Sequence, residues 1–226
     1  MLKNDGAVIC MKYELVIFDL DGTLLDTLDD LAQAVNFALE RQGFPLRSRD
    51  EVRRLIGNGI ASTMRRALPE GSGEAAFTQA LADFRRYYLE HVNVLTRPYD
   101  GIPALLDAMR DAGIRAALNS NKVDSATQAL CQAHFPGKLA CVLGEQPDIP
   151  KKPAPDGALR IIHRLGARPE RTLYVGDGEA DIQTAANAGI DCAWVSWGYR
   201  RASELGNLSI PHAFDSVQAL RSFLLG

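Results

Sequence analysis

Two aspartates that stand two residues apart at the end of an apolar run are the residues of this chain whose types and spacing most clearly suit chemistry. Residues 15–26 read LVIFDLDGTLLD, so that Asp19 and Asp21 are followed at once by Gly22 and Thr23. Glycine lets the chain turn sharply and brings its backbone close to a ligand. A carboxylate can attack phosphorus and form an aspartyl-phosphate, and a second carboxylate can carry the proton that the leaving oxygen needs. The pair therefore indicates phosphoryl transfer beside a divalent cation.

Two simpler interpretations of this segment stay open at this point. A calcium loop of the EF-hand type needs an oxygen ligand at its fifth position and glycine at its sixth. Counted from Asp19, these positions hold Thr23 and Leu24, and the leucine argues against such a loop. An acidic turn without function is the other alternative.

A second polar turn follows the apolar run 114–118 and reads Asn119, Ser120, Asn121, Lys122. A serine hydroxyl and the backbone amides at the start of a helix are donors for phosphate oxygens, which makes this turn a candidate phosphate site. An ordinary helix cap explains the same residues, and it is the preferred interpretation of the turn taken alone.

A third turn is basic and contains two prolines. Lys151 and Lys152 precede Pro153 and Pro155, and proline stiffens a loop, so that one lysine is held at a fixed place. A positive charge there can screen a phosphoryl group from the carboxylate that attacks it. A solvated basic turn is the alternative.

A fourth turn, GDGEAD, is acidic and follows the apolar run 172–175. Asp177 and Asp181 stand four residues apart beside glycines. A magnesium site uses one or two carboxylates together with water and substrate phosphate, so these two acids can supply half of one. Glu179 lies between them and can replace either in a looser geometry.

The elements that must position these turns alternate along most of the chain. Apolar runs predict strands at 15–18, 114–118, 141–143, 172–175 and 190–195, and helical spacing predicts helices at 102–112, 123–134, 156–165, 179–188 and 216–225. Repeated strand and helix at this spacing are typical of a parallel, doubly wound sheet, whose ligands bind at the carboxyl ends of the strands. The predicted fold class is therefore α/β.

One block of the chain shows helical patterns only. It covers residues 28–97 and lies between the first strand and the rest of the alternation, which predicts a separate helical subdomain. We expect residues 13–27 and 98–226 to form the α/β core. Residues 1–12 are expected to form a disordered extension.

The four turns, taken together and in order, resemble the motifs of the haloacid dehalogenase superfamily of phosphohydrolases. DLDGTL, the serine turn, KKPAPD and GDGEAD appear in that order, and the resemblance covers the chain from about Tyr13 to its end. It implies a magnesium-dependent phosphatase on a Rossmann-like core with an inserted all-helical cap. Carried over by position, Asp19 resembles the nucleophile and Asp21 the general acid and base.

The same resemblance implies roles for the phosphate-binding residues. Ser120 resembles the hydroxyl that binds phosphate, and Asn121 resembles a residue that assists it. Lys152 directly precedes PAPD and matches the motif lysine better than Lys151 does.

For the metal, the resemblance implies Mg²⁺ held by four aspartates. Asp19 contributes its carboxylate and Asp21 its backbone carbonyl. Asp177 resembles a direct ligand, and Asp181 resembles a ligand or a supporter that acts through water. A cation at this place neutralises the repulsion between an anionic nucleophile and an anionic substrate.

Two features narrow the resemblance within the superfamily. This chain has a second acid, Asp21, at a position where true dehalogenases lack one, which sets it apart from them. Residues 28–97 contain no lysine, which excludes the Schiff base of phosphonoacetaldehyde hydrolases. A phosphomutase of the β-phosphoglucomutase type would keep the same four motifs and stays an alternative.

The cap segment that begins IGNG resembles the phosphoglycolate phosphatase subgroup. Gly57, Asn58 and Gly59 form a glycine-flanked helix start whose backbone amides can take a small carboxylate, and Arg65 or Arg66 can add charge. A plain turn with solvated arginines is the alternative. The expected substrate is 2-phosphoglycolate, ahead of pyrophosphate, sugar phosphates and nucleoside monophosphates.

Composition sets limits on the partners. The 226 residues are 46% hydrophobic with a net charge of -3, which recommends neither nucleic acid nor an anionic membrane. No apolar run is long enough to span a bilayer, and no signal peptide is recognisable. The four cysteines form no CxxC pair, which favours a reducing cytoplasm. We expect a monomer or homodimer that acts on a small phosphorylated metabolite.

Overall fold

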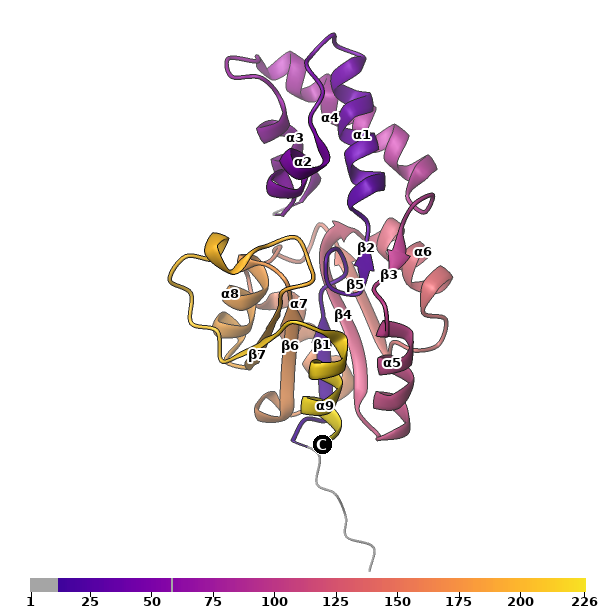
Figure 1. Ribbon diagram of the computed structural model, residues 1–226, viewed down its shortest axis with the longest axis vertical. Coiled ribbons are helices and arrows are strands. Elements are labelled where there is room, and N and C mark those ends of the chain that lie inside the picture. Colours follow the sequence, from indigo (N-terminus) through magenta and orange to yellow (C-terminus); the bar gives the residue numbers. More distant parts are fainter. Residues whose placement is uncertain (1–11, 58) are drawn as a thin grey trace, which may run out of the picture.

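A six-stranded parallel sheet forms the centre of the larger part of the molecule (Figure 1). In the computed structural model, which describes residues 12–57 and 59–226, the strand order is β5-β4-β1-β6-β7-β8. The strands are β1 (Leu15–Phe18), β4 (Arg115–Val123), β5 (Cys141–Glu145), β6 (Thr172–Gly176), β7 (Asp191–Val195) and β8 (His212–Phe214). Because β1 pairs with β4 on one side and β6 on the other, the segments that follow these three strands meet at one edge.

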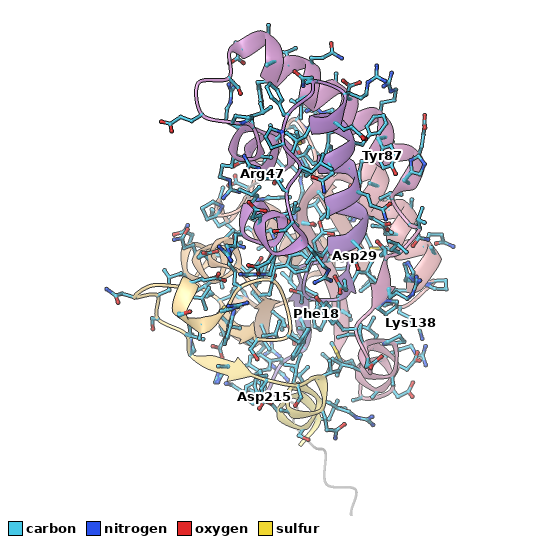
Figure 2. The ribbon with its side chains drawn as sticks, turned by 45° about the horizontal axis from the view of Figure 1, so that its top comes forward. Phe18, Asp29, Arg47, Tyr87, Lys138 and Asp215 are labelled. Carbon is cyan, nitrogen blue, oxygen red and sulfur yellow. The ribbon has the colours of Figure 1, made fainter. Side chains whose placement is uncertain are left out.

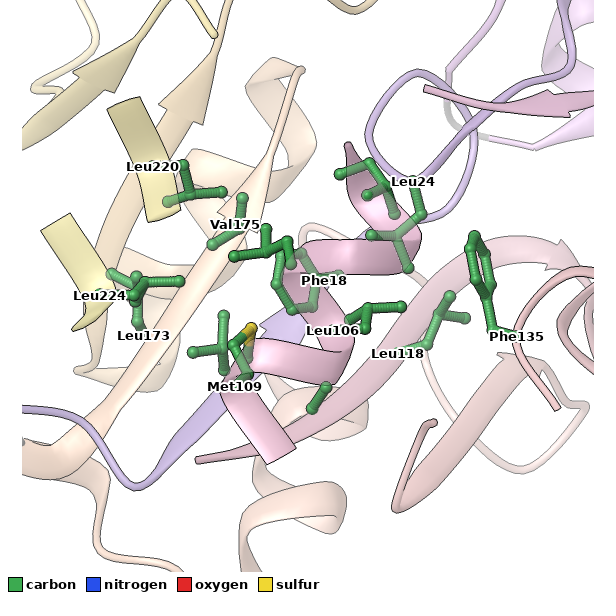
Figure 3. Packing of buried hydrophobic residues seen from close by; sticks show 14 of the residues in the cluster. Phe18, Leu24, Leu106, Met109, Leu118, Phe135, Leu173, Val175, Leu220 and Leu224 are labelled. Atoms are coloured by element: carbon green, nitrogen blue, oxygen red, sulfur yellow. The ribbon is translucent and has the colours of Figure 1, made fainter. Parts of the chain in front are cut away.

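Helices cover both faces of this sheet, and β1 shows why. Its four residues are fully buried, with Val16 and Phe18 in the cluster on one face and Leu15 and Ile17 in the cluster on the other. The first face is covered by α5 (Ile102–Asp111), α6 (Asp124–His134) and α9 (Val217–Leu225), and the second by α7 (Asp156–Leu165) and α8 (Glu179–Ala188). Figure 3 shows Phe18 among Leu106, Met109, Leu118 and Val175 of the first cluster. A strand buried on both faces must be continuously apolar, which is the pattern that predicted the parallel sheet.

Four helices form a cap above the carboxyl ends of the strands (Figure 1). They are α1 (Leu28–Glu40), α2 (Arg49–Leu55), α3 (Ile60–Ala67) and α4 (Glu74–His91). Their apolar faces share a core of their own, which includes Val35, Phe84 and Tyr88. In Figure 2, Arg47 and Tyr87 lie on the cap, whereas Phe18 lies inside the sheet domain.

The chain enters and leaves the cap at the same place. The strands β2 (Leu25–Asp26) and β3 (Arg97–Pro98) pair antiparallel between core and cap. The buried carboxylate of Asp30, in the first turn of α1, accepts the backbone N–H groups of Val94, Leu95 and Thr96 at 2.9–3.1 Å. Backbone donors that converge on one carboxylate give strong, charge-assisted hydrogen bonds. The two linkers are therefore fastened to each other.

The expected fold class, a doubly wound α/β core with an inserted helical cap, is confirmed. The strand predicted at 114–118 extends to Val123, and β8 was not predicted. No helix within residues 12–57 and 59–226 combines the length and the apolar character that crossing a membrane requires. The extension expected over residues 1–12 lies outside the described residues, apart from Lys12.

Candidate active site

The four polar turns meet in one cavity between the carboxyl edge of the sheet and the cap. Its volume is about 410 Å³. On the core side it is lined by Asp19, Asp21, Ser120, Asn121, Lys122, Lys152, Asp177, Asp181, Tyr199 and Arg200, and on the cap side by Leu31, Ile56, Gly57, Gly59, Ile60, Thr63, Arg66, Phe84 and Tyr88. Asp19 and Asp181, which are 162 positions apart in the chain, thus share one site because β1 and β6 are neighbours.

Lys152 joins two of the aspartates. Its Nζ atom lies 2.7 Å from Oδ1 of Asp19 and 2.7 Å from Oδ1 of Asp181, and all three residues are buried. Burial opposes protonation of Lys152, but Asp181 and Asp19 hold its pKa well above its usual range. The lysine therefore stays cationic beside Asp19.

Asp19, Asp177 and Asp181 form an acidic cluster in which one oxygen of each lies within 4.8 Å of the others. Burial raises the pKa of Asp19 to about 7, against the opposing charge of Lys152. Burial, Asp181 and Asp19 raise the pKa of Asp177 to about 8. Carboxylates held this close and away from water favour a bound cation, which would restore their charged forms.

The charges of the site fit a divalent cation. When all four are ionised, the carboxylates of Asp19, Asp21, Asp177 and Asp181 outnumber the neighbouring ammonium groups of Lys122 and Lys152 by two, and only Arg66 on the cap side adds an unpaired positive charge among the described residues that line the cavity. Oxygen donors of this kind suit a hard divalent cation. The side chain of Asp21 is outside the acidic cluster, so its expected metal contact through the backbone remains a prediction.

Asp21 has partners of its own. Its carboxylate accepts from Nζ of the buried Lys122 at 2.8 and 3.0 Å and from the Thr27 hydroxyl at 2.6 Å. Burial opposes protonation of Lys122, but Asp21 raises the pKa of this lysine. The two aspartates of the first turn thus stand in different surroundings, each with its own lysine.

The serine turn differs from its predicted form. Ser120 is buried and lines the cavity but lies within β4, and its Oγ atom accepts the N–H of Lys122 at 3.3 Å. It caps no helix, because α6 begins at Asp124 without a side-chain cap. The Asn121 side chain donates to the carbonyl of Lys152 at 3.1 Å and accepts its N–H at 2.9 Å. Asn121 therefore holds the lysine loop, whereas a contact with phosphate was expected.

Lys151 and Glu179, the alternatives to Lys152 and Asp181, have other partners, and Glu179 also lines the cavity. Lys151 pairs with Glu145 at 2.7 Å, away from the acidic cluster that Lys152 contacts. Glu179 pairs with Arg200 at 3.0 Å, whereas Asp181 lies in the cluster.

On the cap side, Gly57 and Gly59 line the cavity with φ angles of 119° and 84°, and Asn58 lies outside the described residues. The expectation for Arg65 is wrong, because this side chain forms a two-point pair with Glu74 at 2.7 and 3.0 Å and does not line the cavity. Arg66 lines it instead.

Arg66 carries a charge that no ion pair of the described residues balances. Its Nη2 atom donates to the carbonyls of Leu55 and Gly57. Arg66 is exposed, but partial desolvation and the neighbouring Arg200 lower its pKa. An arginine in this setting is a natural site for an anion.

Sequence reasoning missed Lys122, Tyr199 and Arg200. Lys122 stood within a recognised turn, but its pairing with Asp21 depends on β4 lying beside β1. Tyr199 and Arg200 follow β7 in a segment without any motif, and only contacts with distant residues place them in the cavity.

A buried carboxylate beside a lysine and a cluster of three aspartates, under a helical cap, fits the class of capped α/β phosphoryl-transfer enzymes. The model of the haloacid dehalogenase-like hydrolases matches residues 16–195, and the chain belongs to this family. The expected family and enzyme class, a phosphatase of this superfamily, are thereby confirmed.

Individual relatives agree with this assignment. The chain is 30% identical over 213 residues to phosphoglycolate phosphatase of Aquifex aeolicus, which covers 93% of this chain and 98% of that one. It is 33% identical over 195 residues to N-acetylmuramic acid 6-phosphate phosphatase of Pseudomonas aeruginosa, which covers 84% of each chain. A crystal structure of a protein assigned as a phosphoglycolate phosphatase from Lactobacillus delbrueckii superposes with a TM-score of 0.90 at 32% identity, over 96% of this chain and 100% of that one.

Proposed function

We propose that the protein is a Mg²⁺-dependent phosphomonoester hydrolase that acts through an aspartyl-phosphate, with 2-phosphoglycolate as its first candidate substrate. The observation that carries this proposal is the position of Asp19, whose carboxylate lies 2.7 Å from Lys152 and within the acidic cluster. When bound, Mg²⁺ would supply charge neutralisation for the nucleophile and the phosphate. Asp19, Asp177 and Asp181 would hold it, together with the backbone of Asp21.

The residues then divide the reaction into two steps. Asp21 accepts from Lys122 and Thr27 as a carboxylate, so it must take up a proton before the first step. An Asp19 oxygen then forms a bond to phosphorus as the ester P–O bond breaks, and Asp21 gives this proton to the leaving alkoxide. Water next attacks the phosphorus of the aspartyl-phosphate, Asp21 takes a proton from it, and the Asp19 carboxylate is released with inorganic phosphate. Ser120 and Lys152 hold the phosphoryl oxygens throughout.

The cap supports a substrate that carries a carboxylate. Arg66 faces the cavity with an unbalanced positive charge, and 2-phosphoglycolate has its carboxylate one carbon from the phosphate ester. A cavity of about 410 Å³ with Leu31, Ile56 and Phe84 in its walls also has room for a larger, partly apolar substrate. N-acetylmuramic acid 6-phosphate, which bears a carboxylate too, is therefore the second candidate.

A phosphate-release assay with Mg²⁺ tests this function. The panel holds 2-phosphoglycolate, N-acetylmuramic acid 6-phosphate, pyrophosphate, glucose 6-phosphate and a nucleoside monophosphate. We expect turnover to favour the two carboxylate esters, and Asp19→Asn to lower kcat by about a thousandfold or more. Undiminished turnover in Asp19→Asn would refute the nucleophile, and equal activity on all five compounds would refute the preference for carboxylates.

Localisation and assembly complete the proposal. The buried thiols of Cys131, Cys141 and Cys192 are unpaired, which supports action in a reducing cytoplasm. A monomer or a homodimer is compatible with a site built from one chain.

A further inference from the structure

Tyr199 lies between core and cap and uses all three of its polar groups. Its backbone N–H donates to Oδ2 of Asp177 at 2.5 Å, and its carbonyl accepts from Nη1 of Arg53 in the cap. Its hydroxyl contacts Thr27, in the linker between core and cap. The residue is buried, so each of these contacts is shielded from water.

The hydrogen atoms of the hydroxyl contacts can be assigned. The Thr27 hydroxyl has one hydrogen, and it is donated to Oδ1 of Asp21 at 2.6 Å because a carboxylate oxygen can only accept. The Tyr199 hydroxyl must then donate to Oγ1 of Thr27 at 2.9 Å, while its oxygen accepts the Thr27 N–H at 2.8 Å. A directed chain of hydrogen bonds therefore runs from Tyr199 through Thr27 to Asp21.

The segment that contains Tyr199 is fastened to the cap on both sides. The guanidinium of Arg53 forms a two-point pair with Glu204 at 2.9 and 2.9 Å. In the opposite direction, Arg200 donates to the carbonyls of Arg53 at 3.1 Å and Ile56 at 2.5 Å. Arg53 is buried, and planar, two-point pairs of this kind fix geometry as well as charge.

The backbone just before Tyr199 packs tightly against Asp177 of the acidic cluster. Any Cβ atom at the preceding residue, Gly198, would overlap the side chain of Asp177 and the carbonyl of Gly22. A small shift of this segment therefore reaches Asp177 directly.

We propose that Tyr199 is a positioning residue: the seating of the cap through Arg53 fixes Tyr199, and Tyr199 orients both Asp177 and Asp21. The role rests on the proposed function, in which Asp177 holds the metal and Asp21 transfers protons. Groups that orient a metal ligand from behind typically govern metal affinity and activity. The site would be complete only when the cap is seated, which couples closure to catalysis.

The link from Arg53 through the Tyr199 backbone to Asp177 is tested without substrate. Glu204→Gln removes one of the two carboxylates that pair with Arg53, the other being Asp50 at 2.9 Å, and neither Glu204 nor Arg53 lines the cavity. Glu74→Gln is the matched control, because Glu74 holds Arg65 by the same two-point pair within the cap. In titration calorimetry with MgCl₂ alone, we expect Glu204→Gln to bind Mg²⁺ about three- to tenfold more weakly than wild type, and Glu74→Gln to bind it like wild type.

The hydrogen-bond chain from Tyr199 through Thr27 to Asp21 is tested by Tyr199→Phe, which removes only the hydroxyl. Tyr13→Phe is its control, because the Tyr13 hydroxyl donates to Asp191 at the opposite end of the sheet. We expect Tyr199→Phe to lower kcat on the best phosphomonoester about tenfold while KM and Mg²⁺ affinity stay within about twofold. Tyr13→Phe should leave kcat unchanged.

The proposal is overturned if Glu204→Gln binds Mg²⁺ as tightly as Glu74→Gln, or if Tyr199→Phe turns over as fast as Tyr13→Phe. Failure of the proposed function looks different: wild type would bind Mg²⁺ and hydrolyse no phosphomonoester. In that event weaker Mg²⁺ binding by Glu204→Gln still supports the link from Arg53 to Asp177, and unchanged binding still refutes it.

Discussion

The Nζ atom of Lys122 lies 2.8 Å from Oδ1 and 3.0 Å from Oδ2 of Asp21, and the lysine is buried. This lysine reaches Asp21 from the neighbouring strand, whereas Lys152 reaches Asp19 from the loop before α7. The two acids of one turn are thereby separated electrostatically, which is the arrangement that lets two carboxylates take different roles.

Replacement of Lys122 should destabilise the folded protein. In Lys122→Met the carboxylate of Asp21 keeps Thr27 but loses its cation, and we expect the free energy of unfolding to fall by about 2–3 kcal/mol. Lys151→Met, which breaks the more exposed pair with Glu145, should cost less than about 1 kcal/mol. Urea denaturation of both variants checks this, and equal losses would contradict the role given to Lys122.

The metal-free protein should lose stability as the pH rises. The raised pKa of Asp177, about 8 against an ordinary value of 3.8, means that the folded state retains a proton that the unfolded chain has released. Stability is therefore full below about pH 4 for this group and declines toward pH 8. Asp177→Asn should make the loss of stability with rising pH smaller. Mg²⁺ should reverse this loss in wild type but not in Asp177→Asn. Melting temperatures in EDTA and in MgCl₂ at pH 5 and pH 8 measure both effects; an equal slope in wild type and variant would count against the acidic cluster.

Arg66 should set the preference for carboxylate esters. We expect Arg66→Gln to lower kcat/KM for 2-phosphoglycolate about tenfold to a hundredfold, because one charge-assisted interaction is lost, while p-nitrophenyl phosphate is affected by less than about threefold. Arg65→Gln is the control, since Arg65 pairs with Glu74 outside the cavity. Equal effects of Arg66→Gln on both substrates would show that the residue shapes the cap instead of binding the carboxylate.

Gly22 should be required for metal binding. A Cβ atom there would lie 2.5 Å from Oδ2 of Asp177, at a φ angle of 88°. Gly43→Ala is a suitable control, because Gly43 has a similar φ angle of 69° with nothing within 4 Å. Both alanines should reduce stability by about 1–2 kcal/mol through backbone strain, but only Gly22→Ala should lose Mg²⁺ binding. Calorimetry that finds Mg²⁺ binding intact in Gly22→Ala would show that Asp177 can move away.

The sequence predicted best those parts that local signals control. The helices α7 (Asp156–Leu165) and α8 (Glu179–Ala188) form over the predicted residues, because Gly166 and Gly189 end them in the left-handed conformation. Three of the polar segments that line the cavity were recognisable because a buried apolar run leads straight into polar residues.

Long-range pairing explains what the sequence did not reveal. The strands β2, β3 and β8 have two or three residues each, too few for a periodic pattern, and each is defined by pairing with a strand distant in the sequence: β2 with β3, and β8 with β7. Lys122 meets Asp21 across 101 positions, and Tyr199 meets Thr27 across 172. Arg65 and Arg66 are adjacent and chemically identical, so only the orientation of α3 decides which one enters the cavity.

The clamp between Asp30 and the 94–96 segment has a consequence for how such an enzyme can diversify. The chain leaves the sheet domain and returns to it at one place, where Asp30 and the β2–β3 pair join the two linkers. The whole helical cap is therefore topologically a single long surface loop. The entropic cost of closing a loop grows only slowly with its length. A different cap that begins and ends at the same two linkers can therefore be inserted without disturbing strand order or register. Substrate choice can thus change through the cap without altering the sheet, provided that the new cap keeps a contact like that of Arg53 with the Tyr199 carbonyl.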